Sequence, residues 1–203
     1  YGILGNIVFG VMIGNCTVYG YLVSGGNRQY LFSGEFIAIL FMICLINSVM
    51  TYYTYFKDYE GDKKAGKKTI VVKYGITVGK WIGLGGAFLP GAAFGILYSI
   101  GAFTTQAGVA FWILALLTFF LQVWTGVLYY KYPVGDKTYY SLATNFRACA
   151  CGQAALIALF DSQLGLILYL ITYIFIGFLF NLHKIDKKTQ GEIQSGNYSV
   201  SNL

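Results

Sequence analysis

A pair of aspartates inside a lysine-rich segment offers the clearest chemistry in this sequence. Residues 55–69 read YFKDYEGDKKAGKKT, with Asp58 and Asp62 four positions apart. If the preceding helix continues by one turn, that spacing places both carboxylates on one face, where like charges repel. A Mg²⁺ ion favours such an arrangement, because it takes one or two carboxylates and completes its shell with water and phosphate oxygens. The segment therefore predicts a metal–phosphate site, with lysines nearby to neutralise phosphate charge.

Other kinds of site explain the same segment less well. Residues 61–67 fit the phosphate-binding pattern G-x-x-x-x-G-K, but Lys68 stands where that loop needs Ser or Thr, and an apolar helix precedes it instead of a strand. The ligand spacing and terminal Glu of an EF-hand are missing. A plain basic loop that orients the chain in a membrane explains the lysines but gains nothing from the acids. The residues alone leave the plain loop and the metal–phosphate site open.

The elements that must position this segment are membrane-spanning helices. Hydrophobic residues make up 57% of the 203 residues and charged residues 11%, whereas a soluble domain carries about 25% charged residues. Six apolar stretches can cross a hydrocarbon core of ~30 Å as helices. They are 2–24, 33–56, 79–101, 108–130, 140–160 and 164–183. The predicted fold class is an all-α polytopic bundle over residues 1–183, followed by a polar, disordered tail over residues 184–203.

The positions of the lysines predict how the bundle is oriented in a membrane and which partners it has. The connection 57–78, the connection after the fourth stretch and the tail are all basic, whereas the intervening connections contain only Arg28. The positive-inside rule therefore places the Asp58–Asp62 segment and the tail in the cytoplasm. The net charge of +6 belongs to these membrane-flanking loops, so we expect a lipid bilayer as partner and no nucleic acid.

The segment resembles the second aspartate motif of the UbiA superfamily of intramembrane prenyltransferases. That motif runs roughly D-x-x-G-D-x-x-x-G-x-x-T, then a short apolar stretch and Gly, and residues 58–75 follow it. Its place at the cytoplasmic end of a predicted span fits as well, and Leu4-Gly5-Asn6 is similar to the start of the span before the motif helix.

The resemblance implies transfer of a prenyl chain from an allylic diphosphate to a lipid-soluble acceptor, such as an aromatic ring or a tetrapyrrole. In the family, two Asp-rich motifs face each other across the bundle and hold Mg²⁺ on the diphosphate, where the metal stabilises the leaving group. Carried over to this sequence, Asp58 and Asp62 are the expected catalytic and metal-binding residues. Lys63, Lys67 and Lys68 are expected to help bind the diphosphate.

The sequence departs from the family pattern in three ways. The first motif, N-x-x-x-D-x-x-x-D, does not occur in these residues, which begin inside an apolar run at Tyr1. We therefore expect a longer polypeptide, in which the first motif either lies upstream or is missing together with half of the metal site. Tyr55 occupies the position where many members carry a further Asp. Four predicted spans follow the motif, whereas three are usual.

Other polar residues in the spans are candidates for substrate binding, each with a structural alternative. Asn6 and Asn47 are as suited to hydrogen bonding between helices as to substrate contact. Tyr55 could line a substrate pocket or belong to an interfacial aromatic belt. Arg147 could reach the substrate diphosphate or extend to a lipid phosphate. The four cysteines lie in apolar segments, and their spacing favours small buried residues over a zinc site or disulfide.

A second class of function competes with the enzyme. A non-catalytic membrane subunit on the same scaffold could bind a pigment, a quinone or a membrane-protein partner, which would suit the aromatic content of 18%. Loss of pyrophosphate release on changing both aspartates would favour the enzyme.

Overall fold

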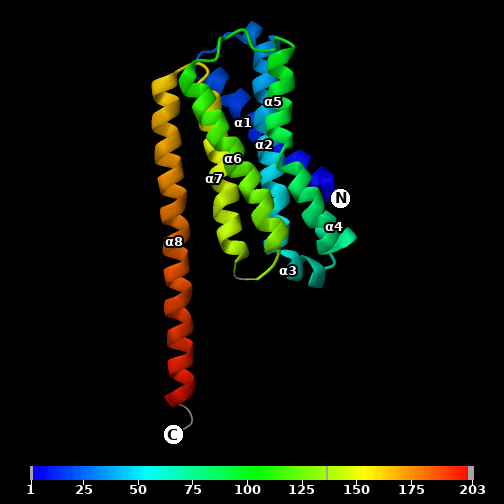
Figure 1. Ribbon diagram of the computed structural model, residues 1–203, viewed down its shortest axis with the longest axis vertical. Helices are drawn as coiled ribbons and strands as arrows, with labels where there is room; N and C mark the ends of the chain where they lie inside the picture. The colour runs from blue at the N-terminus through cyan, green and yellow to red at the C-terminus, as the bar shows by residue number, and fades with distance from the viewer. Residues whose placement is uncertain (1, 136, 201–203) are drawn as a thin grey trace.

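The chain folds into a bundle of long helices. The computed structural model describes residues 2–135 and 137–200, with side chains up to residue 182, and no strand occurs in this part. The elements are α1 (Gly2–Val23), the 3₁₀ helix η1 (Arg28–Phe32), α2 (Gly34–Lys57), α3 (Tyr59–Lys64), α4 (Ile70–Gly86), α5 (Leu89–Ser99), α6 (Val109–Lys131), α7 (Thr138–Ile157) and α8 (Ser162–Val200). This architecture confirms the predicted all-α polytopic class (Figure 1).

Five helical stretches are long and apolar enough to cross a membrane. They are Gly2–Val23, Gly34–Lys57, Ile70–Ser99, Val109–Lys131 and Ser162–Leu182. The fifth predicted span, 140–160, corresponds to α7, which is too polar to qualify by hydropathy but packs against α2, α6 and α8. Its polar side chains Ser141, Thr144 and Asn145 are buried, so α7 is an inner helix that hides its polar groups from lipid.

The third predicted span begins earlier than expected and is broken. Helix α4 begins at Ile70, nine residues before the predicted start at residue 79, because the Thr69 side chain caps it by accepting a hydrogen bond from Val72 N. The non-helical backbone of Gly75 interrupts α4, Ala87 and Phe88 form a turn that keeps right-handed helical dihedrals, and Pro90 lies in the first turn of α5. Proline is tolerated there because its missing N–H would have no partner in that turn. A short turn therefore separates α4 from α5 just before Pro90.

The core lies around α2, which contacts α1, α4, α5 and α7. Gly10 of α1 lies directly against α2, where a Cβ would overlap the carbonyl group of Cys44. Small residues such as this glycine let the helices approach closely. Of the four cysteines, all free, Cys149 and Cys151 are buried, but Cys16 is exposed. The prediction of buried cysteines is therefore confirmed for Cys149 and Cys151 and wrong for Cys16, which lies on the outer surface of α1.

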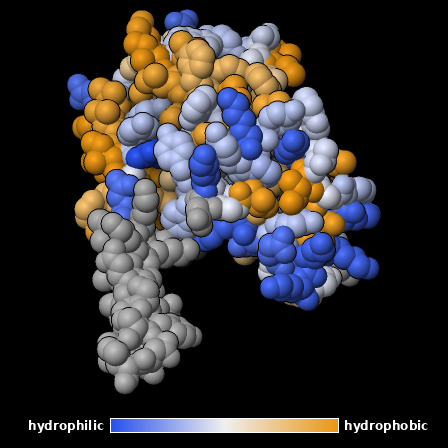
Figure 2. Space-filling model, turned by 60° about the horizontal axis from the view of Figure 1, so that its bottom comes forward, coloured by the Kyte–Doolittle hydropathy of each residue, from blue (hydrophilic) through white to orange (hydrophobic). Residues whose placement is uncertain are grey.

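The motif segment and the α6–α7 connection lie at the same end of the bundle (Figure 1). Hydrophilic side chains gather at this end, whereas apolar side chains cover much of the flanks (Figure 2). Helix α8 leaves the bundle there and stays helical to Val200, where the sequence predicted a disordered tail. Once a helix exists, each further residue adds one hydrogen bond, so it propagates readily beyond a span. The cytoplasmic placement of the tail stays a prediction.

Candidate functional site

The two aspartates flank a bend at the end of α2. Helix α2 ends at Lys57, Asp58 leaves the helical conformation, and the short helix α3 begins at Tyr59. The backbone N–H of Asp62 donates to the Asp58 carbonyl at 2.8 Å, so the two residues keep one-turn spacing across the bend. Their environments differ, because Asp58 is exposed and Asp62 is buried. The second span therefore does not simply continue by a turn.

Asp62 is held by a lysine of the following loop. Lys67 Nζ lies 2.7 Å from Asp62 Oδ1, with the lysine side chain 65% exposed and the aspartate side chain 6% exposed. The backbone N–H of Lys67 also donates to the Asp62 carbonyl at 2.9 Å. Gly66 makes this tight return possible, since its φ of 67° is one that glycine adopts readily. The hydrogen bond to Asp62, with its negative charge, raises the pKa of Lys67, so the ammonium stays charged at neutral pH.

Helix α1 is attached to the motif segment at its first turns. Gly2 N donates to the Lys68 carbonyl at 3.2 Å. The Tyr55 hydroxyl lies against Gly5, where a Cβ would come within 3.2 Å of it. Asn6 is buried and donates from Nδ2 to the Ser48 carbonyl at 3.4 Å, while its Oδ1 has no hydrogen-bond partner among the described residues. Tyr55 and Asn6 therefore lie on the α1–α2 contact, with Tyr55 a turn from Asp58.

The remaining predicted residues fall into two groups. Lys63 and Lys68 are exposed in the motif segment with the aspartates, and Lys63 Nζ lies 5.8 Å from the Tyr59 ring centroid. Asn47 and Arg147 are not part of this group. Asn47 donates to the Ile43 carbonyl at 2.8 Å and accepts from Cys149 Sγ at 3.5 Å, so it joins α2 to α7. Arg147 contacts α8.

Aromatic rings fill the bundle beneath the motif. The rings of Tyr53 and Tyr129 stack at 4.9 Å, and Phe56 packs on Tyr129 at 5.2 Å. All three side chains are almost completely buried. Deeper in the bundle, an apolar cavity of about 600 Å³ lies between α2, α5, α6 and α7, with Gln122 and Thr118 among its few polar lining residues. The motif is therefore supported by a rigid aromatic layer.

The donors at the motif suit Mg²⁺ bound together with a phosphate ligand. No group of three or more His, Cys, Asp or Glu side chains that could hold a metal occurs among the described residues. Asp58 is exposed, and Asp62 offers a carboxylate already paired with a cation. Two hard oxygen donors suffice for Mg²⁺ when water and substrate phosphate supply the rest. The residues thus fit a metal ion that binds together with the substrate phosphate better than a metal ion held by protein ligands alone.

The buried carboxylate of Glu35 was missed by the sequence reasoning. It accepts hydrogen bonds from Thr104 N at 3.0 Å, Thr105 N at 2.8 Å, Thr104 Oγ1 at 2.8 Å and the Tyr30 hydroxyl at 2.9 Å. These four bonds, here called the Glu35 clamp, join the α1–α2 and α5–α6 connections at the end opposite the motif (Figure 1). An acid at the start of an apolar span was the signal that could have revealed it.

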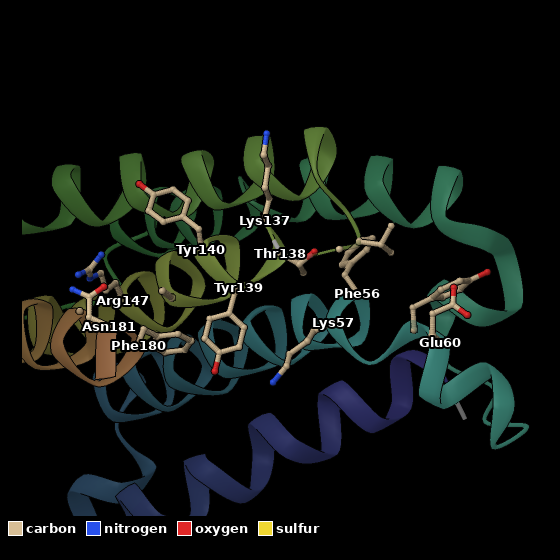
Figure 3. Close-up of a pocket in the computed structure, with 15 residues that line it drawn as sticks. Phe56, Lys57, Glu60, Lys137, Thr138, Tyr139, Tyr140, Arg147, Phe180 and Asn181 are labelled. Carbon is tan, nitrogen blue, oxygen red and sulfur yellow. The ribbon is translucent and has the colours of Figure 1, made fainter. Parts of the chain in front are cut away.

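A second missed feature is a large cavity beside the motif. It has a volume of about 910 Å³ and lies between the end of α2, α3, the α6–α7 connection, α7 and α8 (Figure 3). Tyr59 and Glu60 of α3 line it, rather than the two aspartates. Half of its wall comes from α7 and α8, so no local sequence pattern marks it.

Comparison with known proteins agrees with this site. A family model described as the UbiA prenyltransferase family matches residues 1–147, which include the motif and helices α1 to α6. No curated protein and no solved structure matches the chain significantly. The family match covers more than half of the chain and agrees with the aspartate motif at a helix end, an all-helical bundle and several apolar spans. The chain therefore belongs to the UbiA prenyltransferase family.

Proposed function

We propose that this protein is a Mg²⁺-dependent prenyltransferase in which Asp58 and Asp62 hold the diphosphate of an allylic donor. The state of Asp62 carries this proposal, because its side chain is 6% exposed and pairs with the exposed ammonium of Lys67. A carboxylate that is largely buried needs hydrogen-bond donors or a cation, and among the described residues Lys67 is the side-chain partner of Asp62. A lysine on an exposed loop can be replaced by another cation at small cost, since exposed ion pairs contribute little.

The reaction places defined demands on this end of the bundle. The allylic C–O bond breaks, its electron pair leaves with the diphosphate, and a nucleophilic atom of the acceptor bonds to the prenyl cation and then loses a proton. When bound, Mg²⁺ supplies Lewis-acid stabilisation of the leaving diphosphate. Asp58 and Asp62 orient the diphosphate, and Lys67, once released from Asp62, neutralises part of its charge. Lys63 and Lys68 add positive charge along the same exposed segment.

The surroundings of the motif suit substrates that partition into lipid. Tyr55 and Asn6 lie on the α1–α2 contact next to the motif and are the proposed neighbours of the donor chain. The apolar cavity between α2 and α7, with a volume of about 600 Å³, supports a lipid-soluble acceptor because its lining is mostly aliphatic and aromatic. The basic connections at the motif end support a cytoplasmic placement of the reaction.

Pyrophosphate release from a labelled allylic diphosphate tests the proposal. The full-length protein in lipid nanodiscs should release pyrophosphate with Mg²⁺ and fail to do so with EDTA. The double variant D58A/D62A should lose turnover by roughly 100-fold or more, as expected for removal of preorganised electrostatic stabilisation. Glu60→Ala is the matched control, because it removes an exposed acid from the same helix α3.

The outcomes separate the enzyme from a binding subunit. Wild-type turnover in D58A/D62A would show that the aspartates are not the site. Equal losses in D58A/D62A and E60A would point to the general charge of the segment. Absence of pyrophosphate release from the wild type with a range of donors and acceptors would favour the non-catalytic scaffold.

A further inference from the structure

The large cavity at the motif end, here called the α7–α8 groove, has an exposed rim and a positive lining. Lys57, Lys137, Tyr140 and Asn181 are exposed at its rim, and Glu60 is the one acid among its described lining residues. The cations Lys57, Lys137 and Arg147 and the acid Glu60 therefore line the groove. Its volume of about 910 Å³ is at the upper end of the range for small-molecule sites. The groove can admit a negatively charged group.

Arg147 lines this groove, is half-buried, and has no acidic partner among the described side chains. It is nine residues beyond the start of α7 at Thr138, which places its Cα about 13 Å along the helix at 1.5 Å per residue. The structure records one hydrogen bond from its guanidinium, from Nε to the Tyr173 carbonyl at 3.1 Å. The described residues form no ion pair with it. An arginine within a span is costly unless an anion or water satisfies its remaining N–H groups.

Helix α8 is shaped to receive this guanidinium. The Arg147 guanidinium lies over the Tyr173 ring at 4.6 Å from the centroid. One turn further, Gly177 leaves the space that Nη2 occupies, since a Cβ there would overlap that atom. The side chain thus extends along α8 toward the motif end, where Asn181 follows Gly177 by one more turn. Figure 3 shows Arg147 and Asn181 at the same end of the groove.

The rim adds a second cation on an aromatic surface. Lys57 Nζ lies 5.3 Å from the Tyr139 ring centroid, and the two side chains lie next to each other in Figure 3. The Phe180 ring packs on Tyr139 at 5.5 Å. The groove therefore combines cations with apolar walls, which is the lining that an amphiphile with an anionic head requires.

The groove adjoins the proposed reaction site, because Lys57 and Tyr59 on either side of Asp58 line it. Asp58 and Asp62 do not line it. Tyr173, Gly177 and Asn181 belong to α8, beyond residue 147 where the family match ends. Helix α8, which lies beyond the family match, therefore supplies one wall of the groove.

We propose that the α7–α8 groove binds the phosphate headgroup of an anionic phospholipid, with Arg147 as the principal ligand. A guanidinium binds phosphate oxygens through paired N–H donors. The groove opens at the hydrophilic end of the bundle, and its apolar walls continue into the lipid-facing surface, where Tyr140 is 58% exposed and Phe178 is 56% exposed. A lipid tail can follow that surface while its phosphate lies between α7 and α8. A soluble anion would gain nothing from these walls.

Native mass spectrometry of the full-length protein with added dioleoyl-phosphatidylglycerol tests this assignment. The wild type should retain bound phosphatidylglycerol in preference to phosphatidylcholine. Arg147→Gln should weaken this binding about 10- to 100-fold, the range expected for losing a hydrogen bond to a charged group. Arg28→Gln is the matched control, because Arg28 is the other arginine of the chain and is exposed in η1 at the opposite end, and it should bind like the wild type.

A second variant keeps the charge of Arg147 and changes only the space that its guanidinium occupies on α8. Gly177→Ala should displace the guanidinium from α8 and weaken lipid binding while Arg147 remains. Circular dichroism and size-exclusion chromatography establish that each variant is folded.

Unchanged binding in both folded variants would overturn the proposal, as would equal loss in R28Q or equal retention of phosphatidylcholine. Competition by inorganic phosphate or diphosphate at concentrations similar to the lipid would identify a soluble anion instead. Because the readout is bound lipid, its failure is distinguishable from failure of the prenyltransferase proposal.

Discussion

Two carboxylate sites at opposite ends of the bundle use the same chemical group in different ways. The Glu35 clamp surrounds its carboxylate with four neutral donors from the Tyr30, Thr104 and Thr105 side chains and backbone. At the motif end, Asp58 is exposed and Asp62 is held by one lysine. Neutral donors built into two connections cannot easily leave, whereas an exposed lysine can. The comparison indicates that a fully satisfied buried acid is structural, and that an acid with a replaceable cation is available for binding.

The largest expected effect concerns activity at the motif end. Asp62→Asn keeps the size of the side chain but removes its charge, so we expect turnover to fall by roughly 100- to 1,000-fold with little change in thermal stability. Steady-state pyrophosphate release and thermal unfolding of the same preparation measure the two quantities. A large fall in stability with turnover per folded molecule intact would reverse the roles of the two carboxylate sites.

The Glu35 clamp should show the opposite pattern. Glu35→Ala removes the acceptor for four hydrogen bonds and leaves backbone N–H groups of Thr104 and Thr105 unsatisfied, so we expect a loss of about 2–4 kcal/mol in the free energy of unfolding. Below its lowered melting temperature the variant should retain near wild-type turnover. Denaturant unfolding in detergent micelles provides the measurement, and loss of turnover in the folded variant would contradict the structural role.

Lys67 should have an intermediate effect on donor binding. We expect Lys67→Ala to raise the KM for the allylic diphosphate by about 10-fold, which corresponds to one charged hydrogen bond, with a smaller change in kcat. Lys64→Ala is the matched control, since Lys64 is exposed in the same segment. Equal changes in both variants would mean that the segment acts through its total charge and that the Asp62–Lys67 pair has no special part.

The smallest effect is a pH dependence of the clamp. Burial, followed by the hydrogen bond to Glu35, raises the pKa of Tyr30 from 10.0 to about 12. The neutral hydroxyl therefore contributes stability that is fully present below pH 10 and is lost as the pH rises through about 12. Tyr30→Phe should cost about 1 kcal/mol at neutral pH and reduce the fall in stability over this alkaline range. An unchanged slope between wild type and Y30F would show that another group titrates there.

Much of the fold could be predicted from the sequence. Apolar runs of sufficient length predicted α1, α2, α6 and the membrane-crossing part of α8 to within a few residues, because a lipid-exposed backbone must satisfy its hydrogen bonds within one helix. The early start of α4 was missed, because its first turn, capped by Thr69, is set off from the rest of the helix by the non-helical backbone of Gly75. The polar helix α7 was correctly predicted, although its burial depends on contacts with α2, α6 and α8.

The candidate site was predictable in part. The spacing of Asp58 and Asp62 identified the segment, but the different exposure of the two carboxylates results from the bend at Asp58 and the return of Lys67. Asn47 shows that residue type alone does not identify a substrate-binding residue. Its polar groups are engaged by Ile43 and Cys149 between α2 and α7. Whether an intramembrane polar residue is free to bind substrate depends on neighbours that sequence spacing does not specify.

The sequence by itself determined the membrane-embedded helical class, the basic end of the bundle and the aspartate motif, because these depend on hydrophobicity, charge and short-range spacing. Only the tertiary structure decided which acids are satisfied and where the groove lies. Glu35 meets Thr104 and Thr105 across 69 and 70 positions of the chain, and Arg147 meets Tyr173 across 26 positions. Such contacts arise from helix packing, in which the rotation of each helix decides the partners of its polar side chains.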